Sequence, residues 1–74
     1  MKITDSVSLG KAIRNRRKEL GYTQKYISDF TGLSVSFISD LENGKPTAEL
    51  EKTLSVVNIL ALDIFVEERG KWQI

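Results

Sequence analysis

Side chains that can hold an anion are concentrated in the first third of this sequence. Residues 1–25 contain seven Lys and Arg residues against two acidic ones, a net charge of +5. Residues 26–74 contain four basic and eight acidic residues, a net charge of −4, so that the whole chain carries +1. A basic end beside an acidic end favours one surface that faces a polyanion and another that does not. Solvated charged faces on a small domain are the alternative explanation.

The groups on which most enzymes depend are missing from the sequence. The chain has no cysteine and no histidine, which excludes disulfides, thiolate-based zinc clusters and histidine-dependent catalysis. It has no phosphate-binding glycine loop, and its acidic residues are scattered over the surfaces of predicted helices. Because catalysis needs convergent groups in a pocket, we expect neither an enzyme nor a metal or cofactor site.

The length of 74 residues allows one small domain, residues 1–74. A core of this size contributes only about 3–5 kcal/mol, so we expect a staple or a partner to add stability. No apolar run approaches the roughly 20 residues of a membrane span, and the N-terminus lacks the apolar region of a signal peptide. The sequence therefore predicts a soluble cytoplasmic protein without a membrane partner.

The segment 23–43 predicts two short helices joined by a tight turn. Gly32 interrupts the helical pattern, because glycine readily takes the positive φ that closes a helix, and Ser34 is a suitable N-cap for the next helix. Helices are expected over residues 24–31, with apolar Ile27 and Phe30, and over residues 35–43, with Ile38 and Leu41 facing inward. Two helices this short bury little alone. We interpret the pair as a helix-turn-helix whose second helix faces a DNA groove.

Two further helices flank this pair. Ser8 can cap a helix over residues 9–20, and Thr47 can cap another over residues 48–60. The first helix carries one apolar stripe, with Arg16 at its edge: Leu9, Ala12, Ile13 and Leu20. The fourth helix has an expected inner stripe of Leu50, Leu54, Val57 and Ala61. Its apolar band is widened by Val56, Ile59 and Leu60, and a band wider than one small core needs predicts a subunit contact.

After the fourth helix the apolar pattern changes to a period of two. Apolar residues alternate from Leu62 onward, which predicts a strand over residues 62–68 and a tail over residues 69–74. One strand has no partner within the chain, so a second copy is expected to pair with it and form a homodimer. The expected dimer interface consists of Val56, Ile59, Leu62, Ile64, Phe65 and Val66. Trp72 in the tail either packs on the strand or docks on another protein.

The helix-turn-helix segment resembles the phage-repressor/Cro-like family, and the spacing fits without a gap. The matching residues are Thr23-Gln24, Ser28, Gly32, Ser34, Ile38-Ser39 and Glu42-Asn43-Gly44. Ser28 stands where the family usually has alanine, and serine is small enough to keep the two helices close. The resemblance implies a mainly α fold, a four-helix lambda-repressor-like DNA-binding domain, to which the C-terminal strand adds pairing across a dimer.

The resemblance also implies how the chain binds DNA. Residues of the second helix of the pair enter the major groove, and the expected base contacts are Ser34, Val35, Ser36, Ser39 and Asp40. Phe37 can pack at the helix edge or touch a thymine methyl group. Phosphates are expected at the N-terminus of the preceding helix and after the recognition helix, through Arg17, Thr23, Gln24, Asn43 and Lys45. Arg17 is also expected to form an ion pair with Glu42.

A narrower resemblance is to the HipB-like antitoxins, through the loop Gly44-Lys45-Pro46-Thr47 and the terminal strand. It implies a dimeric repressor of a palindromic double-stranded operator that regulates its own toxin–antitoxin operon, with a HipA-like kinase toxin as a partner. The reading face of the recognition helix has no Arg, Gln or Asn. The alternative is therefore a mainly protein-binding antitoxin that neutralises the kinase, with DNA binding secondary.

Overall fold

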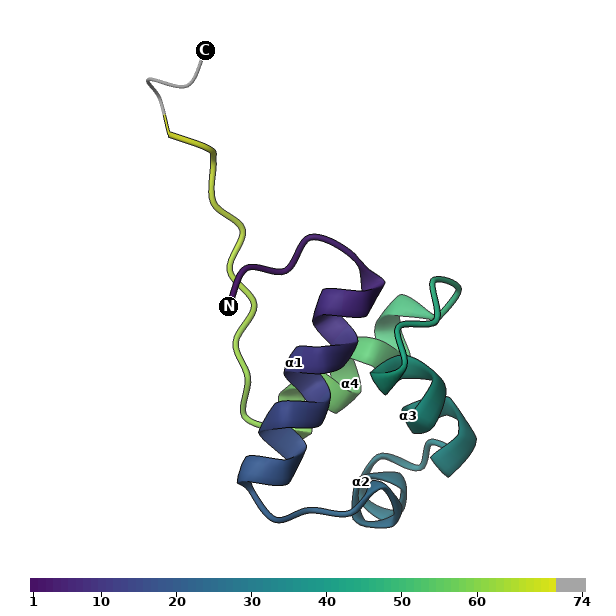
Figure 1. Cartoon of the computed structure of the whole chain (residues 1–74). Helices are drawn as coiled ribbons and strands as arrows, with labels where there is room; N and C mark the ends of the chain where they lie inside the picture. Colours follow the sequence, from purple (N-terminus) through teal and green to yellow (C-terminus); the bar gives the residue numbers. More distant parts are fainter. Residues whose placement is uncertain (71–74) are drawn as a thin grey trace.

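The computed structural model describes residues 1–70 and contains four helices in this range (Figure 1). They are α1 (Ser6–Glu19), α2 (Gln24–Thr31), α3 (Val35–Glu42) and α4 (Leu50–Ile59). Helix α3 packs against α1 and α2, and α4 packs against α2. This is the four-helix arrangement that the sequence predicted. Trp72 and the rest of residues 71–74 lie outside the described residues, and so do the two structures suggested for that tail.

All four helices contribute to the hydrophobic core. Its buried members are Ile13, Ile27, Ile38, Leu41, Val56, Val57 and Leu60. Phe37 is half-buried and packs against this cluster, which favours the packing alternative for this side chain. No described helix is long and apolar enough to span a membrane.

Glycine is required where α1 crosses the end of α3. A Cβ atom on Gly10 would lie only 2.5 Å from the carbonyl oxygen of Leu41. Any side chain at this position would therefore force the two helices apart. The close approach matters for the site, because it packs α1, which also carries Arg17, against the last turn of the expected recognition helix.

The two helices of the expected helix-turn-helix begin at the predicted caps. The Thr23 hydroxyl accepts a hydrogen bond from the Tyr26 N–H, and the Ser34 hydroxyl accepts one from Phe37, each at 3.0 Å. Gly32 ends α2 with φ of 77°, a left-handed conformation that suits glycine. These caps depend on residues three positions away, so local sequence was sufficient to place both helices.

The other two helices begin at residues that the sequence did not predict. Helix α1 starts at Ser6 because Asp5, not Ser8, is its N-cap, and Ser8 completes a reciprocal capping box with Asp5. Helix α4 starts at Leu50, without a side-chain cap. Thr47 is not the cap, because Pro46 and Thr47 form a turn in which the Ala48 N–H bonds to the carbonyl of Lys45 at 3.4 Å.

The buried face of α4 is rotated from the predicted one. Thr53, Val56, Val57 and Leu60 are buried, whereas Leu50 is 70% exposed and Ala61 is exposed. Val56 has no exposed surface in the single chain, so it belongs to the core and not to the expected dimer interface. The prediction failed because α4 is apolar on several faces, and only packing against α2 selects the inner one.

Phe30 and Arg16 make contacts that the sequence did not predict. Phe30, expected on the apolar face of α2, is 61% exposed and packs against Tyr26, with ring centroids 4.5 Å apart. Arg16 is half-buried at the edge of the apolar stripe of α1, and its Nε–H donates to the carbonyl oxygen of Leu60 at 3.0 Å. This bond satisfies a C-terminal carbonyl of α4 and ties that helix end to α1.

Beyond α4 the chain leaves the helices as an extended segment (Figure 1). Residues 63–70 have no secondary structure, so no strand is present in the described single chain. A strand is defined by its hydrogen-bonded neighbour, and the predicted neighbour is a second copy. The pairing of residues 62–68 across a dimer stays a prediction.

Candidate nucleic-acid interface

The N-terminus of α2 is a site that can receive a phosphate. Of its first amides, Tyr26 N–H bonds to the Thr23 hydroxyl at 3.0 Å and Ile27 N–H to the Thr23 carbonyl at 3.2 Å. The amides of Gln24 and Lys25 have no acceptor within the helix. Unsatisfied N–H groups and the positive end of the helix dipole attract an anion at this point.

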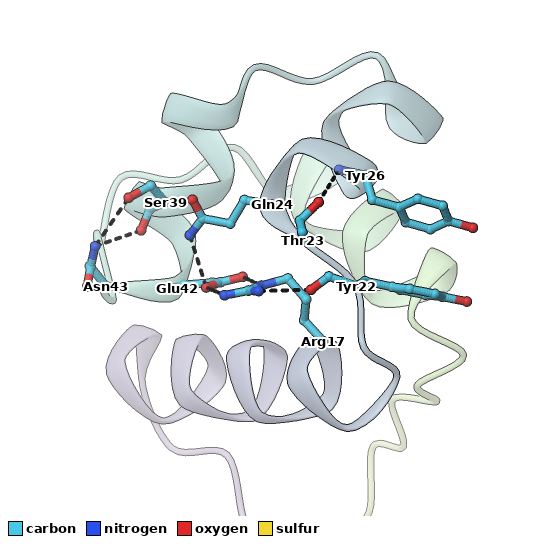
Figure 2. Close-up of polar contacts among 8 residues, drawn as sticks. All are labelled: Arg17, Tyr22, Thr23, Gln24, Tyr26, Ser39, Glu42 and Asn43. Atoms are coloured by element: carbon cyan, nitrogen blue, oxygen red, sulfur yellow. Dashed lines mark hydrogen bonds and ion pairs between the residues drawn. The ribbon is translucent and has the colours of Figure 1, made fainter.

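A buried polar network joins this helix end to α1 and α3 (Figure 2). Arg17 donates from Nε to Glu42 Oε2 at 2.6 Å and from Nη2 to Glu42 Oε1 at 2.9 Å, so the predicted ion pair is present. Gln24 donates to the same Oε1 at 3.2 Å. The Arg17 Nη1 group donates to the Tyr22 carbonyl oxygen at 3.0 Å, which also holds the loop before α2.

The ion pair is shielded from water. The side chains of Arg17 and Glu42 are 12% and 3% exposed. The hydrogen bonds that Arg17 donates to Glu42 raise the pKa of Arg17 above its ordinary value, so the guanidinium stays charged at every accessible pH. Three donor groups of Arg17 already have partners within the chain, so its first role is to hold α1, α2 and α3 together.

The expected base-contacting residues share one exposed side of α3. Ser34, Val35 and Ser36 are exposed, and Ser39 and Asp40 are half-buried. The Ser34 hydroxyl is also the helix cap, so part of its hydrogen-bonding capacity is already used. Ser36 makes no hydrogen bond through its side chain in the described chain and is free to bond to a base edge.

Two interactions on this side were not predicted. Lys45 Nζ lies 3.3 Å from Asp40 Oδ2, and both side chains are about half exposed. Asn43 donates from Nδ2 to the Ser39 carbonyl at 2.9 Å, a bond drawn in Figure 2. Both interactions could have been predicted from sequence spacing. Lys45 follows Asp40 by five residues and Asn43 follows Ser39 by four, and side chains just after a helix can contact its last turn. Lys45 thereby offsets the negative charge that Asp40 would present to DNA.

An aromatic stack runs along another side of α2. The ring centroids of Tyr22 and Tyr26 are 4.4 Å apart, and the stack continues to Phe30. In Figure 2 the rings of Tyr22 and Tyr26 project away from Ser39 and Asn43. Desolvation by its neighbours raises the pKa of Tyr26. The i, i+4 spacing could have predicted this stack.

The expected DNA-contacting residues come from three chain segments: the end of α1, the start of α2, and α3 with the loop after it. The polar side of α3 is flanked by Thr23 and Gln24 at the start of α2 and by Asn43 and Lys45 after α3. Glu42 connects α3 to Arg17 and Gln24. A family model described as helix-turn-helix matches residues 13–64 of the chain. The chain belongs to the helix-turn-helix family.

Relatives within this family are regulators of transcription. Over 70 residues the chain is 34% identical to an uncharacterised HTH-type transcriptional regulator of Sinorhizobium fredii, covering 95% of this chain and 92% of that protein. Over 63 residues it is 38% identical to the competence pilus inhibition repressor of Acinetobacter baylyi. That match covers 81% of this chain but only 57% of the repressor. The helix-turn-helix family is a class of DNA-binding regulators and not of enzymes, as the sequence predicted.

Solved structures share the fold over nearly the whole chain. A HipB–O4 20mer complex matches with a TM-score of 0.86 and 23% identity, covering 95% of this chain and 99% of that one. A HipA–HipB–O2–O3 complex matches with a TM-score of 0.87 at the same identity and the same coverage. The helix-turn-helix chain therefore has the HipB-like arrangement of four helices that the sequence resemblance implied.

Proposed function

We propose that this chain is a dimeric repressor that reads a palindromic operator with α3 and regulates its own toxin–antitoxin operon. The observation that carries the proposal is the exposed polar side of α3, flanked by two groups that can hold phosphates. Val35 and Ser36 lie near the start of α3, where a recognition helix of this type contacts bases. The curated relatives named as a transcriptional regulator and as a repressor support this function.

The proposed DNA contacts are of two kinds: phosphate contacts that position the chain on the duplex, and base contacts that recognise the sequence. Thr23, Gln24, Asn43 and Lys45 would hold phosphates on either side of the groove, and Arg17 would add a phosphate contact through its remaining N–H groups. Serine hydroxyls can bond to several bases, Val35 can contact a thymine methyl, and Asp40 can accept from a cytosine amino group. Because none of the readers makes a bidentate bond to guanine or adenine, DNA shape would contribute strongly to specificity.

Dimerisation would involve the apolar side chains that the single chain leaves uncovered. Ile64, Phe65 and Val66 are 55%, 79% and 96% exposed. Ile59 and Leu62 are half-buried at the adjoining end of α4. Two copies joined through these residues would present two α3 helices to successive major grooves, and each copy would bind one half-site.

A HipA-like kinase toxin is the proposed protein partner. The support is the shared fold with HipB, which one solved structure contains in a HipA–HipB–O2–O3 complex. The second candidate function, a mainly protein-binding antitoxin, has its own observation. Asp40 keeps a carboxylate on the reading side, and its pairing with Lys45 occupies a cation that would otherwise be free for phosphate.

The first experiment selects DNA from the source genome with the purified full chain. We expect recovery of a two-fold symmetric motif with half-sites about one helical turn apart. The matched variants are Ser36→Asp and Ser55→Asp, which add the same charge at exposed positions of α3 and α4. Ser36→Asp should lose the motif and Ser55→Asp should keep it. Equal retention by both variants would show that α3 is not the reading helix.

The second experiment distinguishes the two candidate functions. The proposed partner, a HipA-like kinase, is produced together with this chain, and any complex is isolated with and without the selected operator. A regulator and antitoxin should bind kinase and operator together. Tight kinase binding by the Ser36→Asp variant, with no symmetric DNA motif for the unaltered chain, would favour the mainly protein-binding antitoxin.

A further inference from the structure

The loop after α3 begins with a fixed backbone. Lys45 N–H donates to the Asp40 carbonyl oxygen at 3.0 Å, and Gly44 N–H donates to the Leu41 carbonyl oxygen at 3.1 Å, with Gly44 at a φ of 81°. These two hydrogen bonds are those of a Schellman helix end. They place Lys45 directly after the last turn of α3, and its Nζ lies 3.3 Å from Asp40 Oδ2.

The first turn of α1 holds the next peptide group of this loop. The Ser6 hydroxyl donates to the Gly44 carbonyl oxygen at 2.9 Å, although the two residues are 38 positions apart. Gly44 is buried, and a Cβ atom on it would lie 2.9 Å from the Cα atom of Val7. The two backbones are therefore in contact, without a side chain between them. The carbonyl oxygen of a buried residue needs a donor, and Ser6 supplies it.

Ser6 is itself held in place by the cap of α1. It is the first residue of that helix and lies between the two members of the capping box. In that box Ser8 N–H donates to Asp5 Oδ1 at 2.7 Å, and Asp5 N–H donates to Ser8 Oγ at 3.1 Å. Because the backbone of Ser6 is fixed on both sides, its hydroxyl can hold the loop at little further cost in conformational entropy.

We infer that Ser6 is a positioning residue for the phosphate contact of Lys45. The inference rests on the proposed DNA-binding function and adds to it a residue outside the helix-turn-helix. The carbonyl group that Ser6 holds belongs to the peptide bond between Gly44 and Lys45, so the hydrogen bond fixes the backbone from which the lysine side chain extends. Only that side chain must then move from Asp40 to a phosphate, because the loop is ordered before DNA binds.

A residue that only stabilises the fold would behave differently. In that case Ser6→Ala would lower the free energy of unfolding, and the chain that remains folded would bind operator as before. A positioning residue acts through Lys45, so its loss should matter only while the lysine is present. Two residues that act through each other show non-additive effects in a double-mutant cycle.

The test is a double-mutant cycle of operator affinity, measured by fluorescence titration. It compares the unaltered chain, Ser6→Ala, Lys45→Ala and the double variant, at a temperature at which circular dichroism shows each of them folded. Ser6→Ala should weaken binding about three- to tenfold, the range for ordering one side chain or loop on binding. In the Lys45→Ala background the same substitution should weaken binding less than about twofold.

Two serine variants serve as controls for the lost hydroxyl. Ser6→Thr keeps a hydroxyl at the same position and should bind operator like the unaltered chain. Ser55→Ala removes a hydroxyl that also donates to a backbone carbonyl, that of Glu51 in α4 at 3.2 Å. Because this hydrogen bond does not hold the loop after α3, Ser55→Ala should leave operator affinity unchanged.

Hydrogen exchange in the free chain tests the positioning without DNA. In Ser6→Ala the amides of Gly44 and Lys45 should exchange at least about threefold faster, because the loop has lost its hydrogen bond to α1. The amide of Ile38, which donates to the Ser34 carbonyl at 3.2 Å, lies in the first half of α3 and should exchange as before. Unchanged exchange at Gly44 and Lys45 would overturn the positioning role.

The affinities distinguish a failed inference from a failed function. An equal loss from Ser6→Ala in both backgrounds, or a loss in Ser6→Thr as large as in Ser6→Ala, would overturn the inference and leave the DNA-binding function standing. Unchanged affinity in Lys45→Ala would remove the contact that Ser6 is inferred to position, and the inference with it. Failure of the unaltered chain to select any symmetric operator would overturn the proposed function and the inference together.

Discussion

Arg17 of α1 and Glu42, the last residue of α3, form a two-point ion pair in which both Glu42 oxygens accept a hydrogen bond, at 2.6 and 2.9 Å. Gln24 at the start of α2 donates to the same carboxylate. One buried side chain thus connects three helices at the proposed DNA surface. A bidentate geometry defines the angle between its partners as well as their distance, so the pair orients α3 relative to the helix end that would hold a phosphate.

Removal of Glu42 should destabilise the fold strongly. Glu42→Ala leaves the Arg17 guanidinium without its carboxylate at a site that is only 12% exposed. Breaking one side of such a pair costs about 3–5 kcal/mol in the free energy of unfolding. Urea unfolding followed by circular dichroism measures the loss. A loss below about 1 kcal/mol would contradict the structural role of the pair.

A double substitution separates stability from DNA binding. Arg17→Met with Glu42→Leu replaces the pair by apolar side chains and should recover most of the stability lost in Glu42→Ala. If Arg17 also contacts phosphate, this folded variant should still bind operator DNA more weakly than the unaltered chain. Unchanged affinity would show that Arg17 acts only within the protein.

Ser34 and Ser36 should respond differently to alanine. Ser34→Ala removes the cap of α3 and should lower the free energy of unfolding by about 1 kcal/mol. Ser36→Ala removes a hydroxyl without a partner and should change stability by less than about 0.5 kcal/mol. The DNA motif selected by Ser36→Ala should nevertheless be less specific at one position of each half-site. Equal stability of the two variants would contradict the capping assignment.

Lys45 should contribute affinity without specificity. Lys45→Ala should weaken binding to operator and unrelated DNA alike and reduce the slope of log affinity against log salt by about 1. Arg69→Ala removes the same charge from the C-terminal segment, far from α3 in Figure 1, and is the control. Fluorescence titrations at several salt concentrations give the slopes. An unchanged slope for Lys45→Ala would remove this residue from the phosphate contacts.

Ala61 occupies a backbone conformation that glycine prefers. It has a φ of 55°, and Ala61→Gly should raise the free energy of unfolding by about 0.5–1 kcal/mol, the relief of strain being reduced by glycine's greater freedom when unfolded. The reciprocal control is Gly21→Ala, at a φ of 73° with no atom within 4 Å of the added methyl. It should lose about 1 kcal/mol through conformation alone. Thermal unfolding checks both predictions: the melting temperature should rise for Ala61→Gly and fall for Gly21→Ala.

The cap of α1 should give stability a dependence on acid pH. The backbone hydrogen bond from Ser8 to the Asp5 carboxylate, 2.7 Å long, holds the pKa of Asp5 below its ordinary value. A lowered folded-state pKa means that the contribution is complete above the unfolded-state pKa, about 4, and is lost as pH falls through the lower folded-state pKa. The difference in melting temperature between the unaltered chain and Asp5→Ala should therefore be constant near neutral pH and shrink below about pH 4. An equal difference in melting temperature near neutral pH and below about pH 4 would contradict an ionised Asp5 cap.

The sequence by itself determined the central helix pair, because its signals act over a few residues. Thr23, Ser34 and Gly32 each satisfy or end a helix through bonds to neighbours in the chain, and α2 has the predicted bounds for that reason. The Arg17–Glu42 pair was predictable from family resemblance alone. No local rule connects residues 25 positions apart.

Only the tertiary structure decided which faces are buried and how the site is held. Val56 is buried in the core and Leu50 is exposed, although the sequence predicted the reverse. Helix α4 is apolar on more than one side, and its packing partner determines which side is buried. The same reason explains Arg16, whose hydrogen-bond partner Leu60 lies 44 positions away in the sequence. Local hydrogen bonds determine where helices begin and end, whereas burial and long-range polar contacts depend on the packing of the whole chain.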